Sequence, residues 1–323
     1  MKKIFVCCAV FAILIFSLQS FVLSQDKIKI VVIPKGRTTF FWKSVHTGVR
    51  LGGISLHGTE IIWSPPQIDD DIKQQISIVE NCIKEGVSGI ALAPADYEAL
   101  TECVAKAKSK KIPVLIFDSS LKGAAGKNFI SYVSTDNRKA GNLAGDQLAK
   151  LVGLKGNVVL LRYVAGQAST TDREDGFVEA ISKYKNIRLI VKDRYAGSTV
   201  EDAKNTCLGI IDKLNEADGI FCPNEQSTMG MLLSLRSAHL AGKVKFVGFD
   251  ASTSLIEALK KGELDLLISQ DPSRMGFFCV KTLNDCIRGK KYSLSIDTGV
   301  RMITRDNLND PEIQKLLALP EVE

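Results

Sequence analysis

Histidine is scarce in this chain of 323 residues, which contains three: His46, His57 and His239. His46 and His57 stand eleven residues apart in one expected helix, which is not the spacing of two metal ligands. No C-x-x-C pair occurs, and no histidine lies near a cysteine in the sequence. A metal site is therefore not expected, and the histidines are most simply surface or half-buried residues.

Several signatures of enzymes and nucleotide-binding proteins are also absent. No G-x-G-x-x-G follows an expected strand, which argues against a dinucleotide site, and no G-x-x-x-x-G-K-[ST] loop is present to hold phosphates. No G-x-S-x-G supplies the exposed serine of an α/β-hydrolase. We therefore expect no catalytic residues of these kinds and no cofactor.

Neither charge is in strong excess: 42 Lys and Arg against 36 Asp and Glu give a formal net charge of +6. With 45% hydrophobic and 24% charged residues, the composition excludes a disordered chain, a collagen and a coiled coil. The basic clusters at 108–111 and 288–291 close expected helices, where cations complement the helix dipole. A nucleic-acid partner is therefore not expected.

A long hydrophobic run occurs at the N-terminus alone. Residues 4–18 are apolar and follow Lys2 and Lys3, while Val22 and Ser24 occupy the small-residue positions of a cleavage site. This pattern predicts a signal peptide at 1–24 that is cut near Ser24, so the mature protein is exported to the periplasm. The alternative is an uncleaved anchor, because residues 4–23 are about the 20 needed to cross a bilayer.

Six cysteines follow residue 24, and export makes disulfides possible. Cys82 and Cys103 fall on consecutive expected helices, so they either form a disulfide or remain buried free thiols. Cys279 and Cys286 lie in one expected helix with their Cα atoms roughly 10 Å apart, which is too far to bridge.

Beyond the signal, short β-branched runs alternate with amphipathic stretches. Strands are expected at 29–34, 60–63, 89–93, 113–117, 129–133, 157–162, 188–192, 219–222, 245–249 and 266–269. Helices are expected at 41–56, 70–84, 97–109, 138–151, 172–183, 200–215, 227–238, 255–260 and 274–288. Repeated strand–helix units predict parallel sheets covered by helices on both faces. The number of strands exceeds one small sheet, so we predict an α/β fold of two doubly wound lobes joined by brief crossings.

Polar residues stand at or just beyond the carboxyl ends of five expected strands: Asp118, Arg173, Asn224, Asp250 and Gln270. In an open α/β sheet, ligands bind outside this edge. Taken singly, the two aspartates could merely cap the next turn, and Arg173 could merely pair with Glu174. Their convergence on one edge favours a ligand site rich in hydrogen-bonding groups.

Three consecutive aromatic residues, Phe40, Phe41 and Trp42, begin the first expected helix. Neighbouring helical residues point about 100° apart, so at least one of the three should face the strand edge rather than the core. Aromatic rings beside carboxylates and amides suit a carbohydrate, whose C–H faces stack on rings while its hydroxyls form hydrogen bonds. Trp63 is expected in the core.

Six motifs then occur in a characteristic order: FFWKSVHTG after the first strand, DN at 136–137, STTDREDGF at 169–177, FCPNE at 221–225, VGFDAS at 247–252 and SQDP at 269–272. Together they resemble the type I periplasmic sugar-binding proteins of ABC transporters, in the ribose-binding-like group. The same fold forms the effector core of lac-repressor-type regulators. The resemblance covers nearly the whole mature chain. It implies two Rossmann-like lobes, 27–134 plus 271–297 and 135–270 plus 298–323, joined by a three-crossing hinge.

The resemblance also implies roles for residues of the N-terminal lobe. Phe41 and Trp42 would be its stacking aromatics, and Asp118 would accept hydrogen bonds from two sugar hydroxyls. Thr39 stands where the ribose binders often have an asparagine, and Ser119 where they have an arginine. These two departures argue against ribose itself but not against a sugar-like polyol.

In the C-terminal lobe, the resemblance implies that Arg173 binds the ring oxygen and a hydroxyl of the sugar. Asn224 and Asp250 would bind further hydroxyls, and Gln270 would bind one more from the hinge. Asn137, in the DN motif, belongs to the same ligand-binding set.

The sequence therefore predicts a non-catalytic, monomeric receptor that closes on a monosaccharide or related polyol and delivers it to an ABC permease. One alternative is a receptor that is read by a membrane sensor. Another is an enzyme that uses Asp118 and Asp250 as acid and base, although no nucleophile or metal site accompanies them. A third alternative is the effector core of a transcriptional regulator. It would need a DNA-binding helix-turn-helix before Lys27, where the sequence has the expected signal peptide instead.

Overall fold

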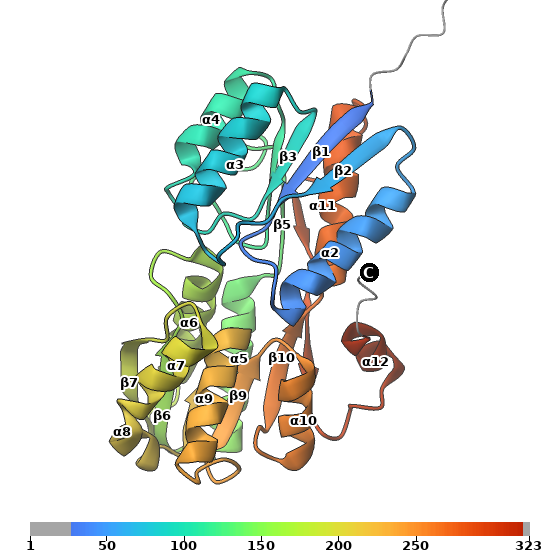
Figure 1. Ribbon diagram of the computed structural model, residues 1–323. Coiled ribbons are helices and arrows are strands. Elements are labelled where there is room, and N and C mark those ends of the chain that lie inside the picture. Colours follow the sequence, from blue (N-terminus) through green and yellow to red (C-terminus); the bar gives the residue numbers. More distant parts are fainter. Residues whose placement is uncertain (1–26, 319–323) are drawn as a thin grey trace, which may run out of the picture.

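The computed structural model describes residues 27–318, which form two lobes that each contain one six-stranded sheet (Figure 1). The first sheet has the order β11-β5-β4-β3-β1-β2, and its strands are parallel. Its strands are β1 Ile28–Ile33, β2 Thr59–Trp63, β3 Gly89–Leu92, β4 Val114–Phe117, β5 Tyr132–Ser134 and β11 Ser295–Asp297. Every residue of β3 and β4 is buried, as expected for central strands covered on both faces.

The second sheet repeats this arrangement in the order β12-β10-β9-β8-β6-β7. Its strands are β6 Gly156–Arg162, β7 Ile187–Tyr195, β8 Gly219–Phe221, β9 Lys245–Phe249, β10 Leu266–Gln270 and β12 Val300–Ile303. β12 runs antiparallel to β10, and the other pairs are parallel. β4 and β9 hold equivalent positions in the two sheets, so Asp118 and Asp250, which follow them, are topological counterparts.

Helices cover both faces of each sheet. In the first lobe, one face carries α2 (Phe40–Ile54) and α11 (Pro272–Ile287), and the other carries α3 (Ile72–Glu85) and α4 (Thr101–Ser109). The second lobe is covered by α5 Asn137–Leu151 and α6 Ala168–Ile181 on one face, and by α7 Val200–Leu208, α8 Ile211–Asn215, α9 Glu225–Ser237, α10 Thr253–Lys261 and α12 Pro311–Leu317 on the other. Within 27–318, no helix has the length and apolar character needed to cross a membrane.

Two helix pairs pack with their backbones in contact. At the α2–α11 crossing, a Cβ on Gly48 or Gly276 would lie 1.8 or 2.1 Å from a backbone oxygen of the partner helix. At the α5–α6 crossing, a Cβ on Gly141 would lie 1.9 Å from the backbone oxygen of Arg173, and one on Gly176 2.2 Å from an oxygen of α5. Any side chain at these positions would push the helices apart.

The chain crosses between the lobes at residues 135–136, 271 and 298–299. The crossings lie side by side, since Thr298 N–H donates to Ser134 O (2.9 Å) and Thr135 Oγ1 donates to Gln270 Oε1 (3.0 Å). The predicted fold class is confirmed: an α/β protein of two doubly wound lobes joined by a three-crossing hinge.

Some elements differ from the sequence prediction. The helix expected at 172–183 begins at Ala168, and the one expected at 200–215 breaks into α7 and α8 near Gly209. The sequence does not predict β11, β12 or α12, which are short and mostly exposed and therefore lack a clear hydrophobic period.

The structure also settles the state of three side chains outside the ligand site. The sequence left the pairing of two cysteines open and predicted a core position for Trp63. Cys82 and Cys103 are buried free thiols, so the disulfide alternative is not realised in the structure. Burial raises the pKa of each thiol to about 11, which disfavours the reactive thiolate. Trp63 is half-buried and stacks on His46 with ring centroids 4.6 Å apart, so it lies at the edge of the core rather than inside it.

Candidate ligand-binding cleft

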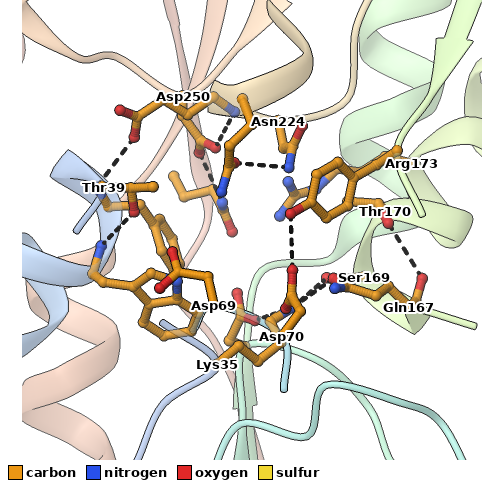
Figure 2. Close-up of a pocket in the computed structure, with 17 residues that line it drawn as sticks. Lys35, Thr39, Asp69, Asp70, Gln167, Ser169, Thr170, Arg173, Asn224 and Asp250 are labelled. Carbon is orange, nitrogen blue, oxygen red and sulfur yellow. Dashed lines mark hydrogen bonds and ion pairs between the residues drawn. The ribbon is translucent and has the colours of Figure 1, made fainter. Parts of the chain in front are cut away.

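A pocket lies between the lobes, where the carboxyl ends of the parallel strands of both sheets meet (Figure 2). Eight of the ten residues predicted to bind a ligand line it: Thr39, Phe41, Trp42, Asp118, Arg173, Asn224, Asp250 and Gln270. The remaining lining residues are Lys35, Asp69, Asp70, Tyr163, Gln167, Ser169, Thr170, Glu225 and Gln226. Polar side chains of the two lobes thus face one another across the pocket.

Asp118 follows β4 and is 3% exposed. Its Oδ2 forms an ion pair with Lys35 Nζ at 2.9 Å but accepts no well-directed hydrogen bond, which leaves it able to accept from another donor. Lys35 Nζ also donates across the cleft to Gln167 Oε1 (3.2 Å) and Ser169 Oγ (3.4 Å). Lys35 therefore couples Asp118 to the opposite lobe.

Asp250 follows β9 and is 7% exposed. Its Oδ1 accepts a hydrogen bond from Gln270 Nε2 (2.9 Å), and its Oδ2 accepts one from the backbone N–H of Glu225 (3.1 Å). The next helix, α10, begins after Ser252 and takes no hydrogen bond from Asp250, so Asp250 does not simply cap its own turn. Burial raises the pKa of Asp250, while the nearby Arg173 opposes that rise.

Arg173 lies within α6 and is 2% exposed. Its Nε donates to Asn137 Oδ1 (2.8 Å), and its Nη1 donates to a backbone oxygen at 2.8 Å. The guanidinium carbon lies 4.0 Å from the centroid of the Phe249 ring, a cation–π contact. Glu174 pairs with Arg162 at 2.7 Å, so the simple Arg173–Glu174 pair considered from sequence does not form.

Asn224 both caps a helix and lines the pocket. Its Oδ1 accepts from the backbone N–H (3.1 Å) and the hydroxyl (2.6 Å) of Ser227, in a capping box that begins α9. Its Nδ2 donates to Gln226 Oε1 (3.0 Å). These bonds fix the orientation of the amide at the pocket wall.

The aromatic wall comes from the start of α2. Thr39 is the N-cap, and its Oγ1 accepts from the backbone N–H of Trp42 (3.3 Å). The rings of Phe41 and Trp42 meet edge to face with centroids 4.9 Å apart, and Trp42 meets Phe117 in the same way at 6.4 Å. This packing holds both rings rigidly beside the polar groups.

Ser119 and Asn137 are not among the lining residues. Ser119 Oγ accepts from the backbone N–H of Ser169 across the cleft (3.2 Å). Asn137 accepts from Arg173 and donates to Ser134 Oγ (3.4 Å). Both side chains therefore lie outside the pocket lining and form hydrogen bonds to residues that belong to it, Ser169 and Arg173.

The sequence analysis missed several lining residues, among them Lys35, Asp70 and Tyr163. Tyr163 Oη donates to Asp70 Oδ2 (2.8 Å) and so joins the lobes directly. Lys35 and Tyr163 follow the expected strands at 29–34 and 157–162, so the rule that found Asp118 could have found them as well. Asp70 lies in a long loop after β2, and no sequence signal placed it at the pocket.

Carboxylates outnumber cations in the pocket lining, which contains Lys35 and Arg173 against Asp69, Asp70, Asp118, Glu225 and Asp250. Burial, followed by the charge of Asp250, raises the pKa of Glu225 to about 7. Burial likewise raises the pKa of Asp69 and of Asp70. Among the residues that the structure describes, no group of three or more His, Cys, Asp or Glu side chains could hold a metal ion.

Three of the pocket aspartates have a left-handed backbone conformation. The φ angles of Asp70, Asp118 and Asp250 are 65°, 61° and 67°. This region is uncommon for residues with side chains, although aspartate tolerates it better than most. Such strain clusters at functional sites, and for Asp118 and Asp250 it coincides with the carboxyl ends of equivalent strands.

Comparison with known proteins agrees with this geometry. A family model described as a periplasmic binding protein domain matches residues 30–291. The chain is similar to the periplasmic component of an ABC-type sugar transport system from Hahella chejuensis, with 34% identity, a TM-score of 0.81, and coverage of 85% of this chain and 99% of that one. It is also similar to an ABC transporter solute-binding protein from Agrobacterium vitis with bound D-fucose, with 32% identity, a TM-score of 0.85, and coverage of 90% and 99%.

A third relative is the ribose import binding protein of Haemophilus influenzae, which is 28% identical over 239 residues, or 73% of this chain and 78% of that protein. These relatives are binding proteins and transport components rather than enzymes. The acid–base interpretation of Asp118 and Asp250 is therefore wrong. With a family model that spans most of its length, and with this cleft between two lobes, the chain belongs to the periplasmic binding protein family and is a binding protein rather than an enzyme.

Proposed function

We propose that this protein closes on a monosaccharide or related polyol and delivers it to an ABC permease. The observation that carries the proposal is the pocket itself, where rigid aromatic rings of one lobe face carboxylates, amides and a guanidinium drawn from both lobes. A polyol matches this combination because its C–H face stacks on a ring while its hydroxyls donate and accept hydrogen bonds. The relatives that transport sugars or contain D-fucose support the same class of ligand.

In this proposal each side chain has a distinct role. Phe41 and Trp42 stack on the ligand, and Thr39 holds their helix start beside it. Asp118 and Asp250 accept from hydroxyls, and the residues that donate to the ligand are Arg173, Asn224 and Gln270. Ser119 and Asn137 do not contact the ligand but orient Ser169 and Arg173, to which they are hydrogen-bonded.

Ligand binding is coupled to closure of the two lobes, which we assign to 27–134 plus 271–297 and 135–270 plus 298–323. A ligand that contacts both lobes stabilises the closed arrangement, so it shifts the hinge equilibrium by its difference in affinity for the two arrangements. Hydrogen bonds of Lys35 and Tyr163 across the cleft also stabilise the closed arrangement, and they form without a ligand.

The proposed site of action is the periplasm. The predicted signal peptide at 1–24 lies outside the described residues, and we propose that export ends with cleavage near Ser24. The mature protein then acts as a monomer that docks on its permease.

A ligand panel tests the proposal. The mature chain is screened by thermal shift against aldopentoses, aldohexoses, 6-deoxyhexoses and pentitols, and hits are measured by calorimetry. We expect a saturable one-to-one isotherm with micromolar or tighter affinity, or about −8 kcal/mol. Arg173→Lys keeps the charge but loses the planar fork of donors, so it should abolish the response. A panel without any hit at millimolar concentration would contradict the proposal.

A further inference from the structure

The pocket lining contains five carboxyl groups and two cationic side chains. When all five carboxyl groups are ionised, the lining therefore has a net charge of −3. Lys35 lies against Asp118, and Arg173 is bonded to neutral groups and the Phe249 ring. Two further cations interact electrostatically with the pocket, Arg37 with Asp69 and Lys43 with Glu225, but both belong to exposed residues outside the lining.

Asp69 is a pocket carboxylate whose two oxygens accept from neutral donors. Its Oδ1 accepts from the backbone N–H of Arg37 (3.2 Å), and its Oδ2 accepts from Thr38 Oγ1 (3.3 Å). The oxygens of Asp250 also accept from neutral donors, but Asp250 has in addition the charge of Arg173 nearby. A Cβ on Gly36 would lie 2.4 Å from Asp69 Cγ, so a glycine at this position makes room for the carboxylate. Figure 2 shows Asp69 beside Asp70, across the pocket from Asp250.

Two further polar atoms of the pocket wall lack hydrogen-bond partners. Asp118 Oδ2 has its ion pair but no well-directed donor, and Gln167 Nε2 has no well-directed acceptor, although the carboxylate of Asp70 interacts with the Gln167 side chain. Both side chains belong to residues that are at most 3% exposed, so water does not readily satisfy them. An unpaired carboxylate oxygen needs a donor, and an unpaired amide N–H needs an acceptor such as a hydroxyl or ring oxygen. These atoms therefore point to a bound molecule that carries both kinds of group.

We propose that the natural ligand is a cationic member of the class above: a sugar or polyol with a protonated amino group that Asp69 accepts. This inference rests on the proposed function and narrows it. When the lobes close, water leaves the pocket, and with a neutral polyol the excess carboxylates would either take up protons or stay buried without compensation. An ammonium group on the ligand compensates that charge, while the remaining hydroxyls pair with Asp118 and Gln167.

The test compares matched ligands on the wild-type mature protein at pH 7. Calorimetry measures D-glucosamine, D-galactosamine and D-mannosamine against their parent hexoses and their N-acetyl derivatives, and 1-amino-1-deoxypentitols against the pentitols. We expect at least one amino compound to bind ten or more times as tightly as both its parent and, for the hexosamines, its neutral N-acetyl derivative. Equal or tighter binding of the neutral parents in every pair would overturn the inference and leave the proposed function standing. Absence of binding by every compound would overturn the inference, and the proposed function would fall with it only if the aldopentoses and 6-deoxyhexoses of the wider panel also failed to bind.

A variant tests whether the negative charge of Asp69 causes the preference for amino compounds. Asp69→Asn keeps the shape and an acceptor for the N–H of Arg37, and its amide N–H can donate to Thr38 Oγ1 in place of the present bond. It removes the negative charge, so the preference for the amino compound should fall below threefold. Glu98→Gln removes a charge from an exposed surface pair with Lys122 and should keep the full preference. Melting temperatures of both variants establish that they are folded. An unchanged preference in a folded Asp69→Asn protein would overturn the role of Asp69.

Discussion

At the scale of single residues, Asp250 links three parts of the cleft. Asp250→Asn should weaken the binding of a sugar hit at least tenfold, which is about 1.4 kcal/mol, because ligand hydroxyls lose a charged acceptor. It should also lower the melting temperature, since one of the two donors, Gln270 Nε2 or the N–H of Glu225, would face an amide N–H in place of its acceptor, at a cost of about 1–3 kcal/mol. Calorimetry and thermal unfolding of one protein measure both effects.

A suitable control for Asp250→Asn is Asp265→Asn. Asp265 accepts from Lys245 Nζ and from the backbone N–H of Phe246, away from the pocket lining. That variant should lose stability and keep its affinity. If Asp250→Asn behaves in the same way, Asp250 has a structural role alone.

The aromatic wall gives a spectroscopic readout at the same scale. Beyond the signal the sequence has two tryptophans, and Trp42 lines the pocket while Trp63 does not. Ligand binding should change the fluorescence of the wild type and of Trp63→Phe. It should change the fluorescence of Trp42→Phe far less, because the remaining indole lies outside the pocket. A full signal in Trp42→Phe would remove Trp42 from the site.

At the scale of helices and strands, the backbone contact between α5 and α6 places Arg173. In Gly141→Ala the new methyl group would meet the backbone oxygen of Arg173, so the helices must separate at a cost of about 1–3 kcal/mol. Because Arg173 then moves, ligand affinity should fall together with the melting temperature. Gly209→Ala has its nearest contact at 3.3 Å and an ordinary φ, and should change both quantities little. Wild-type affinity in Gly141→Ala would show that α6 does not control Arg173.

The elements that the sequence predicted well are those with strong local signals. Four residues of the run PVLIF, Val114–Phe117, form β4 and are all buried, and the same pattern correctly placed Asp118 just beyond a strand. The start of α6 was wrong by four residues because its N-cap, Gln167, makes no capping hydrogen bond and leaves no sequence signal. Contacts such as that of Lys35 with Gln167 join residues 132 positions apart, so they depend on how the lobes meet rather than on any local pattern.

At the scale of the whole molecule, Glu225 reaches across the cleft to the backbone N–H of Phe41 at the start of α2 (3.4 Å). Its pKa is raised from 4.5 to about 7, so the folded, closed protein holds this proton more tightly than the unfolded chain does. Stability should therefore fall as pH rises from about 4.5 to about 7 and should level off above that range.

Thermal unfolding between pH 4.5 and 8 measures this slope. Glu225→Gln cannot titrate, so its melting temperature should depend less on pH than that of the wild type. Part of the slope should remain, because burial also raises the pKa of Glu174 to about 7. Identical slopes in the two proteins would mean that Glu225 does not titrate in this range.

The glycine crossings and the three short linking segments have a mechanical consequence. Each lobe has a pair of helices whose backbones are in contact, so we expect each lobe to move as a rigid body and the bending to occur at 135–136, 271 and 298–299. In a rotation about these crossings, parts far from them, such as α4 and α8, would move farther than the crossings themselves (Figure 1). A single distance between dyes on those two helices would read whether the pocket is filled.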